Sequence, residues 1–140
     1  MSTLVAYEAT AEADAALDVG IAEASRRGLP LEIVTYLGGA VVESVGQAQA
    51  SRTERDAVEK ALAGAEARAS SAGVTASTRI LGGVNAADAV VAHAESAAAE
   101  LTVVGVRRRS AVGKLLMRST SRDVILAAHC PVLAVKSPVR

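Results

Sequence analysis

Residues 101–135 read LTVVGVRRRSAVGKLLMRSTSRDVILAAHCPVLAV, and this stretch decides the fold. It opens with a short apolar run at 101–104, passes through a basic loop from Gly105 to Ser119, and continues as a helical pattern before a second apolar run at 132–135. Short apolar runs bounded by turn residues are typical of buried strands. A strand, a helix and another strand in succession predict parallel pairing through a crossover connection.

The rest of the chain repeats this alternation of strand and helix. Apolar runs predict further strands at residues 3–7, 31–37 and 74–81, and the alternating polarity of the last run favours a place near a sheet edge. Apolar positions recur at helical spacing between the strands, and the long helix predicted from residue 51 has a charged face. Residues 38–50 show no clear period and are predicted to form a loop.

Polar residues and glycine mark where the predicted helices begin and end. Thr10 and Asn85 stand directly before helical patterns and are predicted N-caps, while Gly28 ends the first helix. Ser119 or Ser121 is expected to cap the last helix.

These elements predict an α/β fold in a single domain over residues 1–140. The expected architecture has three layers: a doubly wound, five-stranded parallel sheet of order 3-2-1-4-5 with helices on both faces. Ligands bind such sheets outside the carboxyl ends of the strands, where the strand order reverses. The loops at residues 7–10 and 105–119 are expected to meet there.

Composition excludes several classes of function. The formal net charge is zero, so nonspecific electrostatic binding to nucleic acid is not expected. The only aromatic residues are Tyr7 and Tyr36, so a surface on which nucleic-acid bases stack is not expected either. The single cysteine, Cys130, suits a reducing compartment, and no apolar stretch is long enough to span a membrane. We expect a cytoplasmic protein with no membrane partner.

The residues most often used in catalysis have ordinary structural explanations here. His93 is interpreted as a half-buried helix residue, His129 as a helix-end cation, and Cys130 as a buried, inert thiol. Glu12 and Asp14 are assigned to the exposed first turn of a helix, where they complement its dipole. No nucleophile, base and orienting group converge, so an enzyme is not expected.

Three stretches together resemble the universal stress protein family: TLVAYEATAEADAAL, GGVNAADAV and the C-terminal run quoted above. The resemblance covers nearly the whole chain. Nucleotide-binding members of that family carry a loop of Gly, two residues, Gly, nine residues, Gly, and then Ser or Thr. Aligned without a gap, this loop begins at Gly105 and ends at Ser119, but Arg108 and Arg118 occupy the second and third glycine positions.

The end of the first predicted strand also differs from the family pattern. Nucleotide-binding members tend to have Asp there, and this chain has Glu8, although the hydroxyl two residues later is kept as Thr10. Glu8 is expected either to reach into an adenosine pocket or to pair with Arg107 or Arg108 and close an empty one.

The arginines in the loop act in opposite directions on phosphate binding. Glycine lets a loop approach a phosphate closely, which an arginine at position 108 or 118 opposes. Arginine side chains also attract phosphate, so Arg107, Arg108, Lys114 and Arg118 could hold an anion without backbone contacts. Three outcomes stay open: ATP or AMP (with Mg²⁺ if ATP), another anion, or no ligand, the last being favoured.

If a nucleotide binds, the resemblance implies where its parts lie. Adenine is expected near Tyr7, Tyr36 and Val104, beside Glu8 and Gly105. The phosphates are expected near Arg107, Arg108, Arg118, Ser119 and Thr120.

The resemblance implies a non-catalytic stress-response protein that acts through partner proteins. The last strand, at residues 132–135, is expected to pair with its counterpart in a homodimer. The alternative is a nucleotide-responsive switch in which ATP or AMP orders residues 38–50. A slow nucleotide hydrolase is a third hypothesis, with Glu8 as the only visible candidate to position water.

Overall fold

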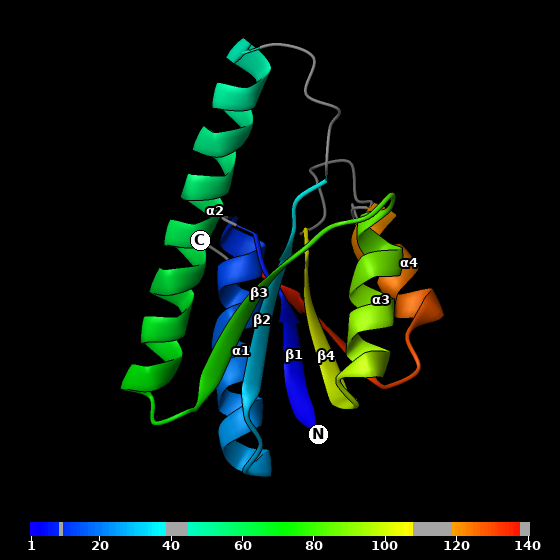
Figure 1. The fold of residues 1–140 in the computed structure, drawn as a ribbon. Coiled ribbons are helices and arrows are strands. Elements are labelled where there is room, and N and C mark those ends of the chain that lie inside the picture. The colour runs from blue at the N-terminus through cyan, green and yellow to red at the C-terminus, as the bar shows by residue number, and fades with distance from the viewer. Residues whose placement is uncertain (9, 39–44, 108–118, 138–140) are drawn as a thin grey trace.

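The computed structural model describes residues 1–8, 10–38, 45–107 and 119–137, and it shows the predicted alternation of strands and helices (Figure 1). The elements in chain order are β1 (Ser2–Ala6), α1 (Ala11–Arg27), β2 (Leu31–Tyr36), α2 (Val45–Ser71), β3 (Ala76–Leu81), α3 (Ala86–Ser96), β4 (Ala99–Val106), α4 (Ser119–Ala127) and β5 (Val132–Lys136).

The five strands form one parallel sheet of order β3-β2-β1-β4-β5, which confirms the predicted order 3-2-1-4-5. Val5 of β1 pairs with Ile33 of β2 on one side and with Val103 of β4 on the other. Helices α1 and α2 cover one face of the sheet and α3 and α4 cover the other, so the predicted three layers are present (Figure 1). β3 lies at one edge, as its alternating polarity predicts.

Each face of the sheet has its own apolar core, because side chains alternate along a strand. Val5 packs with Leu17 and Ile33 beneath α1 and α2. Its neighbour Leu4 packs with Val124 beneath α3 and α4. All five side chains are fully buried, so the central strand β1 contributes apolar side chains to the cores on both faces of the sheet.

Helix α2 begins earlier than its sequence indicates. The predicted loop at residues 38–50 is wrong for residues 45–50, which are helical, while 39–44 lie outside the described residues. The first turns of α2 extend past the ends of the strands, so no sheet lies beneath them to require an apolar stripe (Figure 1). Ala and Gln favour helix without such a stripe.

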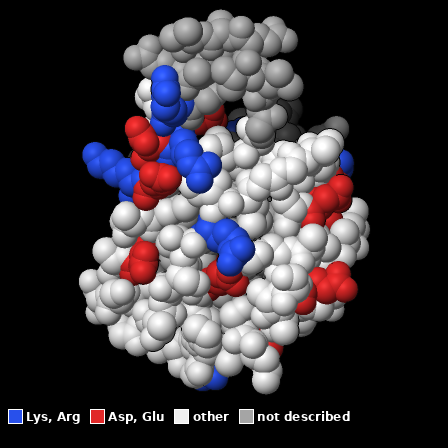
Figure 2. Space-filling model, viewed as in Figure 1, with Lys and Arg blue, Asp and Glu red and all other residues white. Residues whose placement is uncertain are grey.

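Further along α2, the predicted charged face is confirmed. Figure 2 shows charged side chains gathered over this helix, while much of the rest of the same view is uncharged. The exposed members are Arg52, Glu54, Arg55, Asp56, Glu59 and Lys60.

The predicted caps of the first and third helices are confirmed. The Thr10 hydroxyl accepts a bond of 3.2 Å from the Ala13 amide, and the Asn85 side chain accepts one of 3.1 Å from the Asp88 amide. Gly28 ends α1 with φ at 65°, a left-handed conformation that suits glycine.

The cap predicted for the last helix is wrong for Ser121, which lies inside α4. Its hydroxyl donates instead to the Gly105 carbonyl at 3.0 Å and ties α4 to β4. Ser119 is the first residue of α4, and the position before it lies outside the described residues.

Candidate functional site

A pocket lies at the carboxyl ends of β1 and β4, where the strand order reverses, as the fold predicts. Its cavity volume is about 80 Å³, which is smaller than the about 300–1,000 Å³ typical of small-molecule sites, and its mouth is open to solvent. The described lining residues are Ala6, Tyr7, Glu8, Thr10, Glu12, Ala13, Val34, Tyr36, Ala86, Val90, Val104, Gly105, Thr120, Ser121 and Val124.

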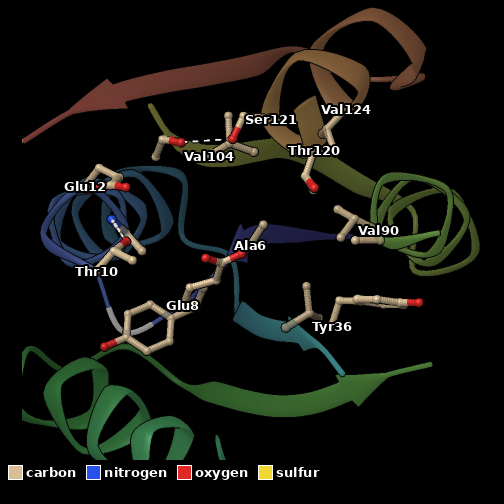
Figure 3. Close-up of a pocket in the computed structure, with 15 residues that line it drawn as sticks. Ala6, Glu8, Thr10, Glu12, Tyr36, Val90, Val104, Thr120, Ser121 and Val124 are labelled. Atoms are coloured by element: carbon tan, nitrogen blue, oxygen red, sulfur yellow. Dashed lines mark hydrogen bonds between the residues drawn. The ribbon is translucent and has the colours of Figure 1, made fainter. Parts of the chain in front are cut away.

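One wall of the pocket is apolar and comes from α3 and α4. Val90 and Val124 are buried there, and Ala86 opens the first turn of α3 beside them. In Figure 3 the Thr120 hydroxyl points from α4 toward the opening, and Glu8 reaches toward the middle of it from β1. This wall suits a flat apolar body that carries a few hydrogen-bonding groups.

The opposite wall is the first turn of α1, and Gly105 determines how close it lies to β4. A Cβ atom at position 105 would lie 2.6 Å from both the carbonyl carbon and the carbonyl oxygen of Glu12. Real side chains do not approach backbone so closely, so only glycine allows this contact. The first glycine of the family loop therefore has a packing role here, whatever it does toward a ligand.

Glu12 is brought by this contact into the pocket, which corrects its assignment to an exposed helix end. Its side chain is only 16% exposed, and its Oε1 lies 3.7 Å from Nε of Arg107, whose side chain is 53% exposed. A pair between Glu8 and Arg107 was one alternative for Glu8, and Arg108, the other arginine considered, lies outside the described residues. The ion pair that the structure gives for Arg107 is with Glu12. The pair joins the start of α1 to the residue directly after β4.

Tyr7 is one of the lining residues, and its hydroxyl is directed toward α1. The hydroxyl donates to Oδ1 of Asp14 at 2.8 Å. Burial, together with this bond to a carboxylate, raises the pKa of Tyr7 from 10.0 to about 12. Arg68 of α2 donates to the same Asp14 oxygen at 3.2 Å and also pairs with Asp18, which links the two helices on this face.

Tyr36 is held from the other side. Its hydroxyl donates to the carbonyl of Gly83, in the turn before α3. Thr35, one residue earlier, donates its hydroxyl to the Tyr7 carbonyl at 2.9 Å. The two tyrosines are thus fixed at neighbouring strand ends, and both residues line the same pocket.

The structure brings together six of the ten residues predicted for the site: Tyr7, Glu8, Tyr36, Val104, Gly105 and Thr120. Arg107 lies outside the lining and pairs with Glu12. Arg108 and Arg118 lie outside the described residues, as does the side chain of Ser119. The role of all ten in binding stays a prediction.

Several lining residues were not predicted, and they are of two kinds. Ala86, Val90 and Val124 look like ordinary helix residues that face a sheet, and nothing local distinguishes a pocket wall from a core. Glu12 and Ser121 could have been predicted as lining residues from the sequence. Both lie within three residues of a predicted N-cap and therefore near a strand end.

His93 and Cys130 are not among the lining residues of this pocket. Nε2 of the half-buried His93 lies 2.5 Å from Oε1 of Glu32 in β2, which agrees with its interpretation as a helix residue. Cys130 was predicted to be buried, but it is half-buried because it lies in the turn between α4 and β5, with its Sγ 3.3 Å from Oγ1 of Thr102. Among the described residues, no group of three or more His, Cys, Asp or Glu side chains could bind a metal ion.

None of the helices in the described part of the chain has a long enough apolar stretch to cross a bilayer.

The fold and the pocket define a doubly wound α/β protein with a cavity at its topological switch point. A model of the universal stress protein family matches residues 1–136. A universal stress protein of Mycolicibacterium smegmatis is 32% identical over 133 residues, which cover 95% of both chains. The chain therefore belongs to the universal stress protein family, as its sequence indicates.

Solved structures agree with this assignment. A universal stress protein from Archaeoglobus fulgidus has a TM-score of 0.79 at 29% identity, covering 97% of this chain and 98% of that one. A structure of the universal stress protein from the same organism in complex with dAMP has a TM-score of 0.68 at 27% identity, with the same coverage.

Proposed function

We propose that this member of the family is a non-catalytic stress-response protein that binds an adenine nucleotide in the pocket between α1 and α4. The observation that carries the proposal is the pocket itself, which the described residues form at the strand ends between an apolar wall and the first turn of α1. The sequence favoured a site that is filled by the loop arginines. Arg108 and Arg118 lie outside the described residues, so that expectation stays a prediction.

The lining supports an adenine nucleoside as the body of the ligand. Val90, Val104 and Val124 offer apolar contact to a flat ring. The Glu8 carboxylate can accept hydrogen bonds from ribose hydroxyls or from an amino group, and the Thr120 hydroxyl can donate or accept one. The dAMP bound by the A. fulgidus relative has the same combination of flat base, sugar and phosphate.

The test is a calorimetric titration of the purified protein with AMP. Ala86 lines the pocket from the partly exposed first turn of α3, so Ala86→Leu should fill the cavity and weaken AMP binding by about tenfold or more. Ala92→Leu, on the exposed part of the same helix, is the matched control and should bind like the unmodified chain. Equal binding by both variants, or no heat with AMP at millimolar concentration, would rule out this site.

The non-catalytic part of the proposal rests on the carboxylates near the pocket. Glu12 is engaged with Arg107 and Asp14 with Tyr7 and Arg68, so neither resembles a poised base. We expect no phosphate release from ATP and Mg²⁺ above the buffer rate over several hours. Turnover that disappears in Glu8→Gln would instead support the hydrolase hypothesis.

We also propose that the protein forms a homodimer through β5. This strand has a neighbour on one side only among the described residues, and Leu133 on it is 36% exposed. An apolar edge strand is stabilised by symmetric pairing with a second copy. Leu133→Lys should give a folded monomer by light scattering, because the side chain is not buried; an unchanged dimer would contradict the proposal.

A further inference from the structure

We infer that Glu12 is a specificity-determining residue that limits the charge of the ligand. Its carboxylate competes with ligand phosphate for Arg107, so the pocket favours adenosine or a monophosphate over ATP. This inference rests on the proposed adenine-nucleotide site and names which members of that ligand class it accepts.

The position of Glu12 follows from the close approach at Gly105. Because residue 105 has no Cβ, the first turn of α1 packs directly against the end of β4. That turn also holds the Thr10 cap, whose bond to the Ala13 amide fixes the backbone on either side of Glu12 (Figure 3). The backbone that carries Glu12 is therefore fixed, and its side chain is only 16% exposed beside Arg107.

The side chains of Glu12 and Arg107 differ in how far they are exposed to solvent. The Glu12 side chain is mostly buried against the pocket, whereas the Arg107 side chain is more than half exposed. Arg107 can turn toward an incoming phosphate, but doing so leaves the carboxylate of Glu12 without that partner in a partly dehydrated place. Binding a phosphate through Arg107 thus requires breaking an existing pair.

The charge of the pocket lining also disfavours ligands that carry several phosphates. Glu12 is one of the described lining residues, and its carboxylate is mostly buried. Each added phosphate brings further negative charge toward this carboxylate, and the repulsion is stronger at a partly buried site than it would be in bulk water. A neutral nucleoside meets no such opposition.

The experiment compares three ligands of increasing charge: adenosine, AMP and Mg²⁺-free ATP. Calorimetry measures each against the unmodified chain and against Glu12→Gln, which keeps the size of the side chain. We expect adenosine affinity to change less than about twofold, AMP affinity to rise about fivefold, and ATP affinity to rise more than AMP affinity. Glu23→Gln, near the other end of α1 and paired there with Arg26 and Arg27, is the control and should change none of them.

A second pair of variants tests the competition for Arg107. Arg107→Gln should weaken AMP binding more in the Glu12→Gln background than in the unmodified chain, because the arginine is then free for the ligand. Equal gains for all three ligands in Glu12→Gln, or unchanged AMP and ATP affinity, would overturn the inference while leaving the nucleotide site standing. No binding of any of the three ligands to any variant would overturn the proposed function and this inference with it.

Discussion

The two walls of the pocket are built in different ways. The α1 wall is fixed by polar and backbone contacts: the approach at Gly105, the Thr10 cap, and the bond from Tyr7 to Asp14. The α3 and α4 wall is fixed by packing of Val90 and Val124 over the sheet. The first wall sets where charge lies, and the second sets the space for an apolar body. Under the proposed function, the ligand is selected for charge on one side and for shape on the other.

Gly105→Ala is expected to lower stability the most, because the added methyl group would clash with the backbone of the α1 wall. The new methyl group would meet backbone of Glu12, so α1 must move as a unit at a cost of about 3 kcal/mol in unfolding free energy. Urea denaturation measures it. Gly64→Ala, at a helical glycine with open space around it, is the control and should stabilise by about 1 kcal/mol. A Gly105→Ala cost below 1 kcal/mol would show that the α1 wall is as adaptable as the other.

Val124→Ala tests the apolar wall. The side chain is fully buried, and its loss removes two methyl groups and enlarges the pocket, which should lower the unfolding free energy by about 2 kcal/mol. The neighbouring Ile125 is 36% exposed, so Ile125→Ala should cost less than Val124→Ala in the same urea measurement. If the two variants lose equal stability, α4 is not held by Val124 and the contrast between the walls fails.

Thr10→Ala removes the cap that orients the first turn of α1. The expected loss is about 1 kcal/mol, since the Ala13 amide is left without its side-chain acceptor. Thermal denaturation of Thr10→Ala and Thr10→Ser separates the cap from other effects, because serine keeps the hydroxyl. Serine and alanine variants of equal stability would mean that the cap does not hold this wall.

Tyr7→Phe has the smallest expected effect at neutral pH, about 0.5 kcal/mol, because Asp14 keeps Arg68 as a partner. The loss of the Tyr7 hydroxyl is best detected in how stability depends on pH. The folded pKa of Tyr7 is raised from 10.0 to about 12, so the proton is held more tightly in the folded state. This contribution to stability is fully present below pH 10 and is lost as the pH rises through 12.

The corresponding measurement is the melting temperature of both proteins from pH 8 to pH 12. The unmodified chain should lose its advantage over Tyr7→Phe between pH 10 and pH 12. If the difference in melting temperature stays constant from pH 10 to pH 12, the Tyr7 hydroxyl does not stabilise the contact between β1 and α1.

The sequence predicted those features that depend on neighbours in the chain. Thr10 and Asn85 could be recognised as caps because a cap is made within three residues, and the strand order followed from alternating elements and the family resemblance. Glu12 was misassigned because its burial depends on Gly105, far along the chain. The early start of α2 at Val45 was missed because a helix shows a periodic apolar stripe only where it packs on a core. The first turns of α2 extend past the sheet, so they have no such stripe.

The position of β1 has a consequence for synthesis. β1 can pair with β2 as soon as Tyr36 has been made, but its other edge waits for β4, which is complete at Val106, about 70 residues later. At roughly 5–20 residues per second, translation takes roughly 4–14 s to supply that strand. The most protected strand of the finished sheet is thus an open, apolar edge on the ribosome, and a pause before residue 106 prolongs the time in which it can aggregate or recruit a chaperone.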